Sequence, residues 1–251
     1  MENFKKKTMK TFGLIGRQID YSFSKSYFSD KFKRDKLDCC YKNFDLEKIE
    51  SFESVFKRAD KISGLNVTIP YKESVIPFLD AIDKDAKTIG AVNTIKISNG
   101  KLIGYNTDHY GFLESLKPKL KPNHSSALIL GTGGASKAVA FALKSMNIKI
   151  KFVSREPKNE NTYIYESLTA EHISAHQLII NCTPLGTHPN TELYPPIPFH
   201  GVTKNHLLFD LVYNPNRTQF LNLGKKYNAN TQNGLKMLKL QAEKSWEIWN
   251  S

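Results

Sequence analysis

The sequence predicts an α/β fold divided into two domains, and three observations lead to this prediction. Short apolar runs typical of strands alternate with segments whose apolar residues recur at helical spacing, and such alternation favours parallel sheets. Two prolines interrupt the alternation once, at 116–123 (LKPKLKPN), and a second alternating series follows. The length of 251 residues suffices for two modest domains. We therefore expect two α/β domains with a cleft between them.

The first series leads to a hairpin. Asn99-Gly100 is the strongest two-residue hairpin signal, and strand-like runs flank it at 91–97 and 101–106. A helix at 107–116 follows, with Thr107 or Asp108 as its N-cap. Before the hairpin we expect strands at 11–16 (TFGLIG), 39–44 (CCYKNF) and 62–70 (ISGLNVTIP), and helices at about 24–37 and at 46–59.

The second series begins with a buried strand at 127–130 and a helix at 135–143. Its last segment, 234–250, places Leu235, Leu238, Trp246 and Trp249 on related helical faces and predicts a long helix. Between them we expect strands within 148–155, 176–184 and 207–215.

Composition indicates a soluble cytoplasmic protein. Apolar residues make up 40% of the chain and charged residues 24%, and no run approaches the roughly 20 apolar residues of a membrane helix. No signal-peptide pattern follows the basic N-terminal residues. The three cysteines lack metal-ligand spacing and are expected to be reduced. His172 and His176 lie four residues apart without a third ligand nearby, so we expect no metal site.

The net charge of +12 allows several kinds of anionic partner. Apart from Lys5–Lys7, the lysines are spread along the chain, and no arginine-rich stripe appears. A nucleic-acid-binding protein would gather its positive charge on one face. Scattered charge instead suits an enzyme whose substrate and cofactor are both anions, so we expect no nucleic-acid or membrane partner.

The segment ALILGTGGASKAVA predicts a dinucleotide site. Gly131, Gly133 and Gly134 form a turn between a strand and a helix, where the backbone can approach a pyrophosphate and free amides bind its charge. Ser136 stands at the third glycine position of the usual pattern, so the match is partial. This motif indicates a Rossmann-like domain.

The end of the next strand bears on the choice of cofactor. About twenty residues beyond the glycines, an acidic residue favours NAD and an arginine favours NADP. Ser154 and Arg155 occupy this place, and Arg155 can bind a 2′-phosphate with its guanidinium fork. Glu156 follows directly and leaves NAD as the alternative.

Eight motifs occur in one order along the chain: YSFSKS, NVTIPYK, GAVNT, NTD, GTGGASK, NCTPLG, DLVYNPNRT and NGLKMLKLQA. In order and spacing, from about Phe12 onward, they resemble the shikimate dehydrogenase family. The resemblance covers nearly the whole chain, and the combination is much more specific than any single motif.

The resemblance implies the reversible NADPH-dependent reduction of 3-dehydroshikimate to shikimate, in the route to chorismate and the aromatic amino acids. It implies NADP as cofactor, a small-molecule substrate, and a monomer or homodimer. An NAD-dependent quinate/shikimate dehydrogenase and a non-catalytic ligand-sensing relative are the alternatives.

The resemblance also assigns roles to residues. An ammonium at Lys72 would stabilise negative charge on the carbonyl oxygen and supply or relay a proton, and Asp108 would hold Lys72 in place. Ser22 and Ser24 would bind the substrate carboxylate, while Lys25 would face away. The other substrate-binding residues would be Asn66, Thr68, Asn93, Tyr213 and Gln241.

The cofactor and the domain boundaries follow from the same resemblance. Because Gln241 lies in the last helix, that helix would return to the first domain. The substrate-binding and catalytic domain would then comprise 1–106 with 232–251, and the NADP-binding Rossmann domain 107–231. The cofactor would be bound by Gly131, Gly133, Gly134, Ala135, Ser154, Arg155, Thr183 and Gly234.

Overall fold

The computed structural model describes residues 9–20, 22–59, 61–156 and 160–251, and the chain divides into two compact units. Unit 1 comprises Met1–Thr107 and Ala242–Ser251, and unit 2 comprises Asp108–Gln241. The lysine cluster Lys5–Lys7 lies outside the described residues. The second boundary between the units lies between Gln241 and Ala242, inside the last helix, α8 (Leu235–Asn250). The sequence predicts this boundary earlier, at 231/232.

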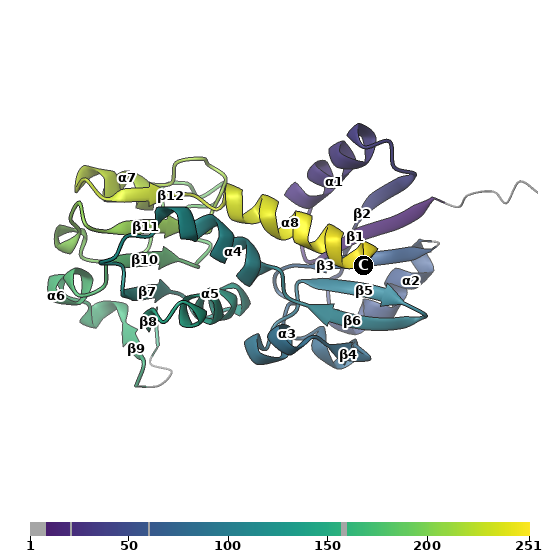
Figure 1. Ribbon diagram of the computed structural model, residues 1–251, viewed down its shortest axis with the longest axis horizontal. Helices are drawn as coiled ribbons and strands as arrows, with labels where there is room; N and C mark the ends of the chain where they lie inside the picture. The colour runs from purple at the N-terminus through teal and green to yellow at the C-terminus, as the bar shows by residue number, and fades with distance from the viewer. Residues whose placement is uncertain (1–8, 21, 60, 157–159) are drawn as a thin grey trace, which may run out of the picture. The chain divides into compact units, whose positions relative to one another are not determined.

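Unit 1 is built on a mixed, mainly parallel sheet. Its six strands lie in the order β2-β1-β3-β5-β6-β4, which Figure 1 shows as successive arrows. The β3/β5 and β5/β6 pairs are antiparallel, and the other pairs are parallel. The strands are β1 (Lys10–Gly16), β2 (Cys39–Asp45), β3 (Ile62–Val67), β4 (Ala81–Ile82), β5 (Thr94–Ser98) and β6 (Lys101–Tyr105).

The predicted hairpin is confirmed. Asn99 and Gly100 have φ angles of 52° and 77°, the left-handed conformation that a tight two-residue turn requires at both positions. The turn sets the register of the pair, in which Ser98 faces Lys101 and Thr94 faces Tyr105. The hairpin therefore returns the chain to the edge of the sheet from which β5 began.

One expected helix is only partly present. Helix α1 (Phe23–Arg34) forms as predicted, but 46–59 folds as a 3-10 helix η1 (Ile49–Ser54) followed by one α-turn, α2 (Val55–Arg58). Spacing of three residues, as in Ile49, Phe52 and Val55, aligns side chains in a 3-10 helix as well as in an α-helix. Unit 1 also contains η2 (Ile76–Phe78) and α3 (Lys84–Ile89).

The second half of α8 completes the core of unit 1. The Trp249 ring stacks on Phe12 at 4.9 Å between centroids and lies 5.3 Å from Phe28. The indole Nε1 donates a hydrogen bond to the Ile95 carbonyl oxygen at 3.0 Å. Such aromatic pairs contribute about 1 kcal/mol each beyond their buried area. The segment 242–250 is therefore an integral part of this unit.

Unit 2 has the Rossmann-like architecture that the sequence predicted. Its six strands are all parallel, in the order β12-β11-β10-β7-β8-β9, visible as a stack in Figure 1. The chain builds outward from β7 on one side, then returns beside β7 with β10 and builds outward on the other. The strands are β7 (Ser126–Leu130), β8 (Lys149–Ser154), β9 (Thr162–Ile164), β10 (Leu178–Asn181), β11 (Leu207–Asp210) and β12 (Asn230–Gln232).

The first half of α8 belongs to unit 2 because it packs on the first helix of that unit. A Cβ at Gly111 would lie only 2.6 Å from the Met237 carbonyl oxygen, so the glycine permits the close approach of the two helices. Phe112 and Met237 then join one apolar core with strands β7, β10 and β11. The helices of unit 2 are α4 (Asp108–Leu116), η3 (Lys117–Lys119), α5 (Gly134–Ser145), η4 (Tyr165–Ser167), α6 (Ala170–Ser174), η5 (Phe199–Gly201), α7 (Gln219–Lys226) and the start of α8.

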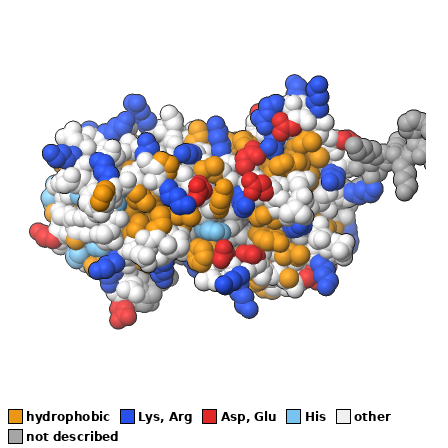
Figure 2. Space-filling model, in the orientation of Figure 1, with side chains coloured by type: hydrophobic (Ala, Val, Ile, Leu, Met, Phe, Trp, Pro, Cys, Tyr) orange, Lys and Arg blue, Asp and Glu red, His pale blue; other side chains and the backbone are white. Residues whose placement is uncertain are grey.

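Basic side chains are dispersed on the surface of each unit. Figure 2 shows lysines and arginines scattered over the visible face, with acidic side chains among them. In the described part of the chain, no helix has the length and apolar character needed to cross a lipid bilayer.

Candidate active site

The predicted residues of unit 1 gather at one edge of its sheet. The parallel strands β1 and β3 end there, at Gly16 and Val67. Because β5 is antiparallel to β3, its beginning lies at the same edge, where Thr94 faces Asn66, and the end of β6 follows at Tyr105. The connections beyond these ends carry Ser22, Ser24, Thr68, Lys72, Asn93 and Thr107.

Asn66 lies at the centre of a buried polar network. Its Oδ1 accepts a hydrogen bond from the Tyr41 hydroxyl at 2.8 Å. Its Nδ2 lies 3.0 Å from Ser245 Oγ and 3.2 Å from both Thr94 Oγ1 and the Asn93 carbonyl oxygen. The two amide hydrogens on Nδ2 thus have three acceptors within the protein. The group with which Asn66 can bind a substrate hydroxyl is therefore a lone pair on Oδ1.

Asn93 forms hydrogen bonds with Thr107, the last residue of the first segment of unit 1. Its Oδ1 accepts from the backbone N–H of Thr107 at 2.7 Å, and its Nδ2 donates to Thr107 Oγ1 at 3.0 Å. Ser245 Oγ lies 3.2 Å from Thr107 Oγ1 and 2.7 Å from Thr94 Oγ1. Asn93 therefore orients the backbone immediately before Asp108, and the hydroxyl of Ser245 in α8 fixes the same point.

Lys72 follows β3 on a turn that is anchored at several points. The Thr68 amide donates to the Ile15 carbonyl oxygen at 2.8 Å, and the Lys72 carbonyl oxygen accepts from the Val92 amide at 2.7 Å. The Tyr71 hydroxyl donates to the Leu46 carbonyl oxygen at 2.6 Å. These bonds fix the backbone of Lys72 beside the strand ends, and its side chain is half-buried.

Ser22 and Ser24 occupy the start of α1. Ser22 is the N-cap, and its Oγ accepts from the Lys25 amide at 3.4 Å. Ser24 is buried, and its hydroxyl hydrogen-bonds to Tyr41, which connects it to Asn66. Lys25 is exposed to solvent.

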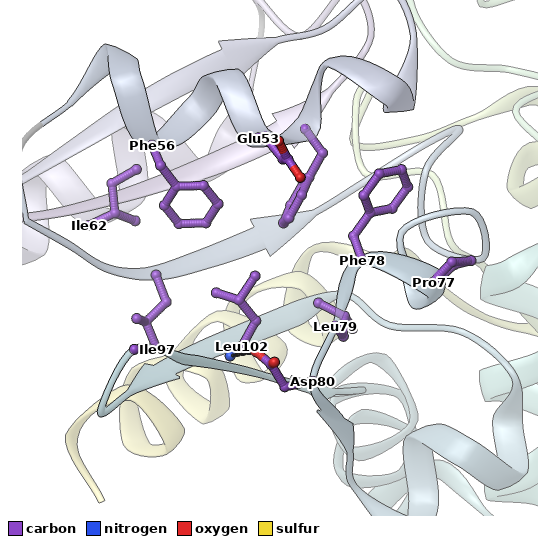
Figure 3. Close-up of a pocket in the computed structure, with 11 residues that line it drawn as sticks. Glu53, Phe56, Ile62, Pro77, Phe78, Leu79, Asp80, Ile97 and Leu102 are labelled. Atoms are coloured by element: carbon purple, nitrogen blue, oxygen red, sulfur yellow. Dashed lines mark hydrogen bonds between the residues drawn. The ribbon is translucent and has the colours of Figure 1, made fainter.

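A separate apolar groove of about 620 Å³ lies elsewhere in unit 1. Figure 3 shows Phe56, Ile62, Phe78 and Leu102 pointing into it. It opens near the start of β3 and the tip of the hairpin, at the opposite end of the strands from Lys72. Its charged lining residues are acidic, Glu53 and Asp80, so it offers no group that would hold a carboxylate.

In unit 2 the predicted cofactor residues also gather at one edge. Gly131 follows β7, Ser154 ends β8, and Thr183 follows β10. Because these strands are parallel, their carboxyl ends share an edge, and in such sheets ligands bind where the strand order reverses. The reversal lies between β7 and β10, where a Cβ at Gly131 would be 3.2 Å from Thr183 Cγ2.

The glycine turn fits a dinucleotide. Gly131 has a φ of 103°, a conformation that favours glycine. Gly133 is the N-cap of α5 without a side-chain cap, and Gly134 and Ala135 begin the helix, so the first amides of α5 are available to an anion. Ser136, at the third glycine position, is fully buried and donates to the Gly133 carbonyl oxygen at 2.6 Å. The serine at the third glycine position therefore helps to close the turn through this hydrogen bond.

Gly133→Ala separates cofactor binding from folding. A Cβ at Gly133 meets no atom within 4 Å, and its φ of −80° suits alanine, so the melting temperature should change by no more than about 2 °C. The same methyl group would occupy space that the pyrophosphate needs, and we expect the Kd for NADP to rise about tenfold or more. Thermal unfolding and calorimetric titration measure the two effects. Unchanged NADP affinity would contradict the assignment of this turn.

Ser154 and Arg155 stand at the end of β8. Ser154 is buried, and its hydroxyl donates to the Glu156 carbonyl oxygen, which closes a short turn after the strand. Arg155 is exposed on that turn and is therefore accessible to an anionic group.

Asp210 ends β11 as a fully buried carboxylate. Its Oδ1 accepts from Asn181 Nδ2 at 2.9 Å and from the Val212 amide at 3.0 Å, and its Oδ2 accepts from Thr218 Oγ1 at 2.5 Å. Burial raises the pKa of Asp210 to about 6 from an ordinary value of 3.8, although the three hydrogen bonds act in the opposite direction.

This pKa predicts how stability depends on pH. Between pH 4 and pH 6 the folded chain holds a proton on Asp210 that the unfolded chain has lost, so folded-state stability falls as pH rises. At about 1.4 kcal/mol per pKa unit, the wild type should lose roughly 2.4 kcal/mol relative to Asp210→Asn between pH 4 and pH 7. Urea unfolding across this range measures the difference. A difference that does not vary with pH would contradict the assigned pKa.

Of the four further predicted residues of unit 2, three lie near strand ends or helix starts, and Gln241 lies in the middle of α8. Tyr213 follows β11 and is half-buried, and burial raises its pKa. Gly234 lies against Leu211, and its amide donates to the Val212 carbonyl oxygen at 3.1 Å. Asp108 begins α4 and is buried. Gln241 is buried in α8, and its Nε2 donates to the Leu238 carbonyl oxygen at 3.0 Å.

Sequence reasoning missed four residues of these networks: Tyr41, Asn181, Asp210 and Ser245. Asn181 and Asp210 end apolar strands with a polar side chain, and that pattern alone could have identified them. Tyr41 and Ser245 give no local signal, because their partners lie far away in the sequence. In the ranges that the structure describes, no three His, Cys, Asp or Glu side chains lie close enough to hold a metal ion.

Comparison with known proteins identifies similar sequences over nearly the whole chain. The family model for the shikimate dehydrogenase substrate binding domain matches residues 14–95. A shikimate dehydrogenase (NADP(+)) from Methanococcus maripaludis is 41% identical over 96% of this chain and 91% of its own length. One from Clostridium botulinum is 37% identical over 96% of both chains.

Solved structures show the same relationship. The shikimate 5-dehydrogenase from Thermus thermophilus, in complex with NADP(H) and shikimate, is 31% identical and superimposes with a TM-score of 0.85. That match covers 96% of this chain and 93% of the Thermus chain. Identity over nearly the whole length, together with the shared fold, shows that this chain belongs to the shikimate dehydrogenase family.

Proposed function

We propose that this protein is an NADP-dependent shikimate dehydrogenase that reversibly reduces 3-dehydroshikimate to shikimate in the biosynthesis of chorismate and aromatic amino acids. The observation that carries the proposal is that polar side chains gather at one end of the sheet strands in each unit. The edge of unit 1 offers hydroxyls, amides and a lysine, which suit a polyhydroxylated acid. The edge of unit 2 offers a glycine turn, a helix start and an exposed arginine, which suit NADP.

Substrate binding is assigned to the residues that the unit 1 edge carries. Ser22 and Ser24 bind the substrate carboxylate, Ser24 once its hydroxyl hydrogen turns from Tyr41 to the carboxylate, and Thr68 and Asn93 bind ring hydroxyls. Asn66 is held by the Tyr41 hydroxyl and Ser245, so its free lone pair accepts from a substrate hydroxyl without reorganisation. Tyr213 and Gln241 complete the set from unit 2.

The proton is assigned to Lys72. When NADPH is bound it supplies a hydride to the ketone carbon, and negative charge grows on the carbonyl oxygen. The Lys72 Nζ ammonium stabilises this charge and delivers a proton to the oxygen. The hydrogen bonds around Lys72 fix its backbone beside the strand ends, within reach of which its side chain carries Nζ. Asp108 is the proposed partner that holds Lys72 in place.

Cofactor binding is assigned to unit 2. The amides of Gly133, Gly134 and Ala135 bind the pyrophosphate at the start of α5, and Gly131 gives it room. Ser154 and Arg155 bind the adenosine end, while Thr183 and Gly234 border the nicotinamide end. We propose that the protein works in the cytoplasm as a monomer or homodimer, without nucleic-acid or membrane partners.

The test is the change in nicotinamide absorbance when purified protein is mixed with shikimate and NADP. Parallel reactions replace NADP by NAD and shikimate by quinate. Reduction of NADP with shikimate alone supports the proposal. Activity with NAD or quinate at comparable rates would assign the protein to quinate/shikimate dehydrogenases. A folded protein without activity on any pair would instead indicate a ligand-sensing relative.

Arg155→Ala tests the cofactor preference. Loss of a charge-assisted bond to the 2′-phosphate should raise the KM for NADPH about tenfold or more, since such bonds contribute roughly 1.5–3 kcal/mol. The KM for NADH should change by less than a factor of about two, because NADH lacks that phosphate. Arg155→Lys should recover part of the affinity, since it keeps the charge without the fork. Equal losses for both cofactors would exclude a 2′-phosphate role.

A further inference from the structure

The buried carboxylate of Asp210 lies where three connections of unit 2 meet. Its three hydrogen-bond donors come from the end of β10 (Asn181), from the loop after β11 (Val212) and from the N-cap of α7 (Thr218). Asp210 itself has no exposed surface, and Asn181 and Thr218 are also fully buried. It therefore acts on bound molecules only through the groups that it holds.

Asn181 connects Asp210 to Thr183 by hydrogen bonds. While its Nδ2 donates to Asp210, its Oδ1 accepts from the Thr183 amide at 2.9 Å and from Thr183 Oγ1 at 2.7 Å. Thr183 Oγ1 in turn accepts from the Leu185 amide at 3.3 Å. The amide plane of Asn181 thus sets the position of the Thr183 hydroxyl, and Nδ2 is oriented by Asp210 at 2.9 Å together with the more distant Leu185 carbonyl oxygen at 3.4 Å.

Val212 connects Asp210 to two other residues, Tyr213 and Gly234. Its amide donates to Asp210, and its carbonyl oxygen accepts from the Gly234 amide at 3.1 Å. Tyr213 is the next residue in the chain. A single carboxylate thereby determines the backbone that carries Thr183, Tyr213 and Gly234.

An aspartate is well suited to this position. An ionised carboxylate accepts several hydrogen bonds and donates none, and its short side chain keeps the acceptors close to the end of the strand. Removing it would leave the Val212 amide and the Thr218 hydroxyl without this acceptor in a buried place, and would leave Asn181 Nδ2 only the Leu185 carbonyl oxygen at 3.4 Å, which is costly for each. Asparagine could replace it with little rearrangement, since its Oδ1 accepts from Asn181 and Val212 while its Nδ2 donates to the Thr218 hydroxyl.

We propose that Asp210 is a positioning residue for the nicotinamide end of the cofactor site: it holds the loops after β10, β11 and β12 in the arrangement that binds NADP productively. This rests on the proposed function, because Thr183, Tyr213 and Gly234 are assigned to that end there. Asp210 does not contact the reacting atoms and acts through Asn181 and Val212.

The alternative is that Asp210 only stabilises the unit, and the chain offers a matched control. His206 directly precedes β11, at the opposite end of the strand from Asp210, and is also buried. Its Nδ1 accepts from the Thr203 amide at 3.0 Å, and its Nε2 lies 3.0 Å from the Ile173 carbonyl oxygen. His206→Ala therefore removes buried hydrogen bonds from the same strand without touching the cofactor edge.

The experiment compares wild type, Asp210→Ala, Asp210→Asn and His206→Ala by amide hydrogen exchange without ligand. In Asp210→Ala, exchange at the amides of Thr183, Val212 and Gly234 should rise about tenfold or more, while the Leu207 amide, at the other end of the strand, changes little. Asp210→Asn should restore protection to within about threefold. His206→Ala should leave these three amides protected.

Kinetics with the same variants test the link to the cofactor. Asp210→Ala should raise the KM for NADP about tenfold and lower kcat, Asp210→Asn should recover both to within about threefold, and His206→Ala should leave both unchanged even if it unfolds at lower temperature. Unchanged exchange at the three amides, or equal kinetic losses in His206→Ala, would overturn the proposal.

Two complications are separable. If Asp210→Ala does not fold, Thr218→Val removes one donor and should still increase exchange at Val212, and protection there would contradict the proposal. If wild type is inactive with shikimate and NADP, the proposed function fails. Exchange and NADP affinity measured by calorimetry then still decide whether Asp210 holds a cofactor site.

Discussion

Lys72→Ala is expected to lower the turnover number by a factor of about 10² to 10⁴ while leaving the affinity for NADP nearly unchanged. The factor is that of removing a general acid or a preorganised charge at the developing oxyanion. Affinity for NADP should persist because Lys72 belongs to unit 1, whereas the proposed pyrophosphate site lies in unit 2. Steady-state kinetics at saturating cofactor and fluorescence titration with NADPH measure the two quantities.

Lys25→Ala is the matched control for this substitution. Lys25 is also a lysine of unit 1 near the strand edge, but its side chain is exposed, and its backbone amide keeps its bond to Ser22 in the variant. Its turnover should stay within a factor of about two of wild type. If both variants lose activity equally, net charge near the site would explain the loss. If Lys72→Ala retains full turnover, Lys72 has no part in the chemistry.

Gly234→Ala is expected to reduce the free energy of unfolding by about 3 kcal/mol and to weaken NADP binding at the same time. A Cβ there would overlap the Leu211 carbonyl oxygen and lie 2.7 Å from the Leu211 carbonyl carbon. Both are backbone atoms, so either the end of β11 or the start of α8 must move, and overpacking of this kind typically costs 1–3 kcal/mol or more. Urea unfolding and calorimetric titration with NADP test both effects.

Gly133→Ala is the control for this second substitution, because it adds the same methyl group where no atom lies within 4 Å. It should weaken NADP binding without loss of stability, whereas Gly234→Ala should show both losses together. A Gly234→Ala variant as stable as wild type would mean that the backbone of Leu211 yields easily, and the close contact would then have no bearing on the site.

Those elements of the fold that depend on neighbouring residues were predictable from the sequence. The Asn99-Gly100 turn, the apolar strands and the glycine turn before α5 are each determined within a few residues, and all are present. The segment at 46–59 was predicted wrongly as one helix, because residues spaced by three serve a 3-10 helix equally well. The short strands β4, β9 and β12 lack a clear apolar pattern and were not predicted.

The candidate site shows a similar division. Lys72 and Thr183 could be proposed because the motifs NVTIPYK and NCTPLG, in which they lie, resemble those of the family. The network that orients Asn66 could not, since its donor Tyr41 and acceptor Ser245 come from another strand and from the last helix. Asp210 lies in the motif DLVYNPNRT, but the sequence predicted no role for it. Its proposed function depends on groups from three connections that only the folded chain brings together.

The return of α8 to unit 1 has a consequence for how the protein is made. Trp249 covers Phe12 and Phe28, yet all of unit 2 is translated between these aromatic residues and the tryptophan. At elongation rates of about 5–20 residues per second, the nascent unit 1 leaves the ribosome roughly ten seconds before its last helix. During that interval the faces of Phe12 and Phe28 that Trp249 later covers lack this partner. Expression of unit 1 alone will therefore require that 242–250 be supplied together with the first 107 residues.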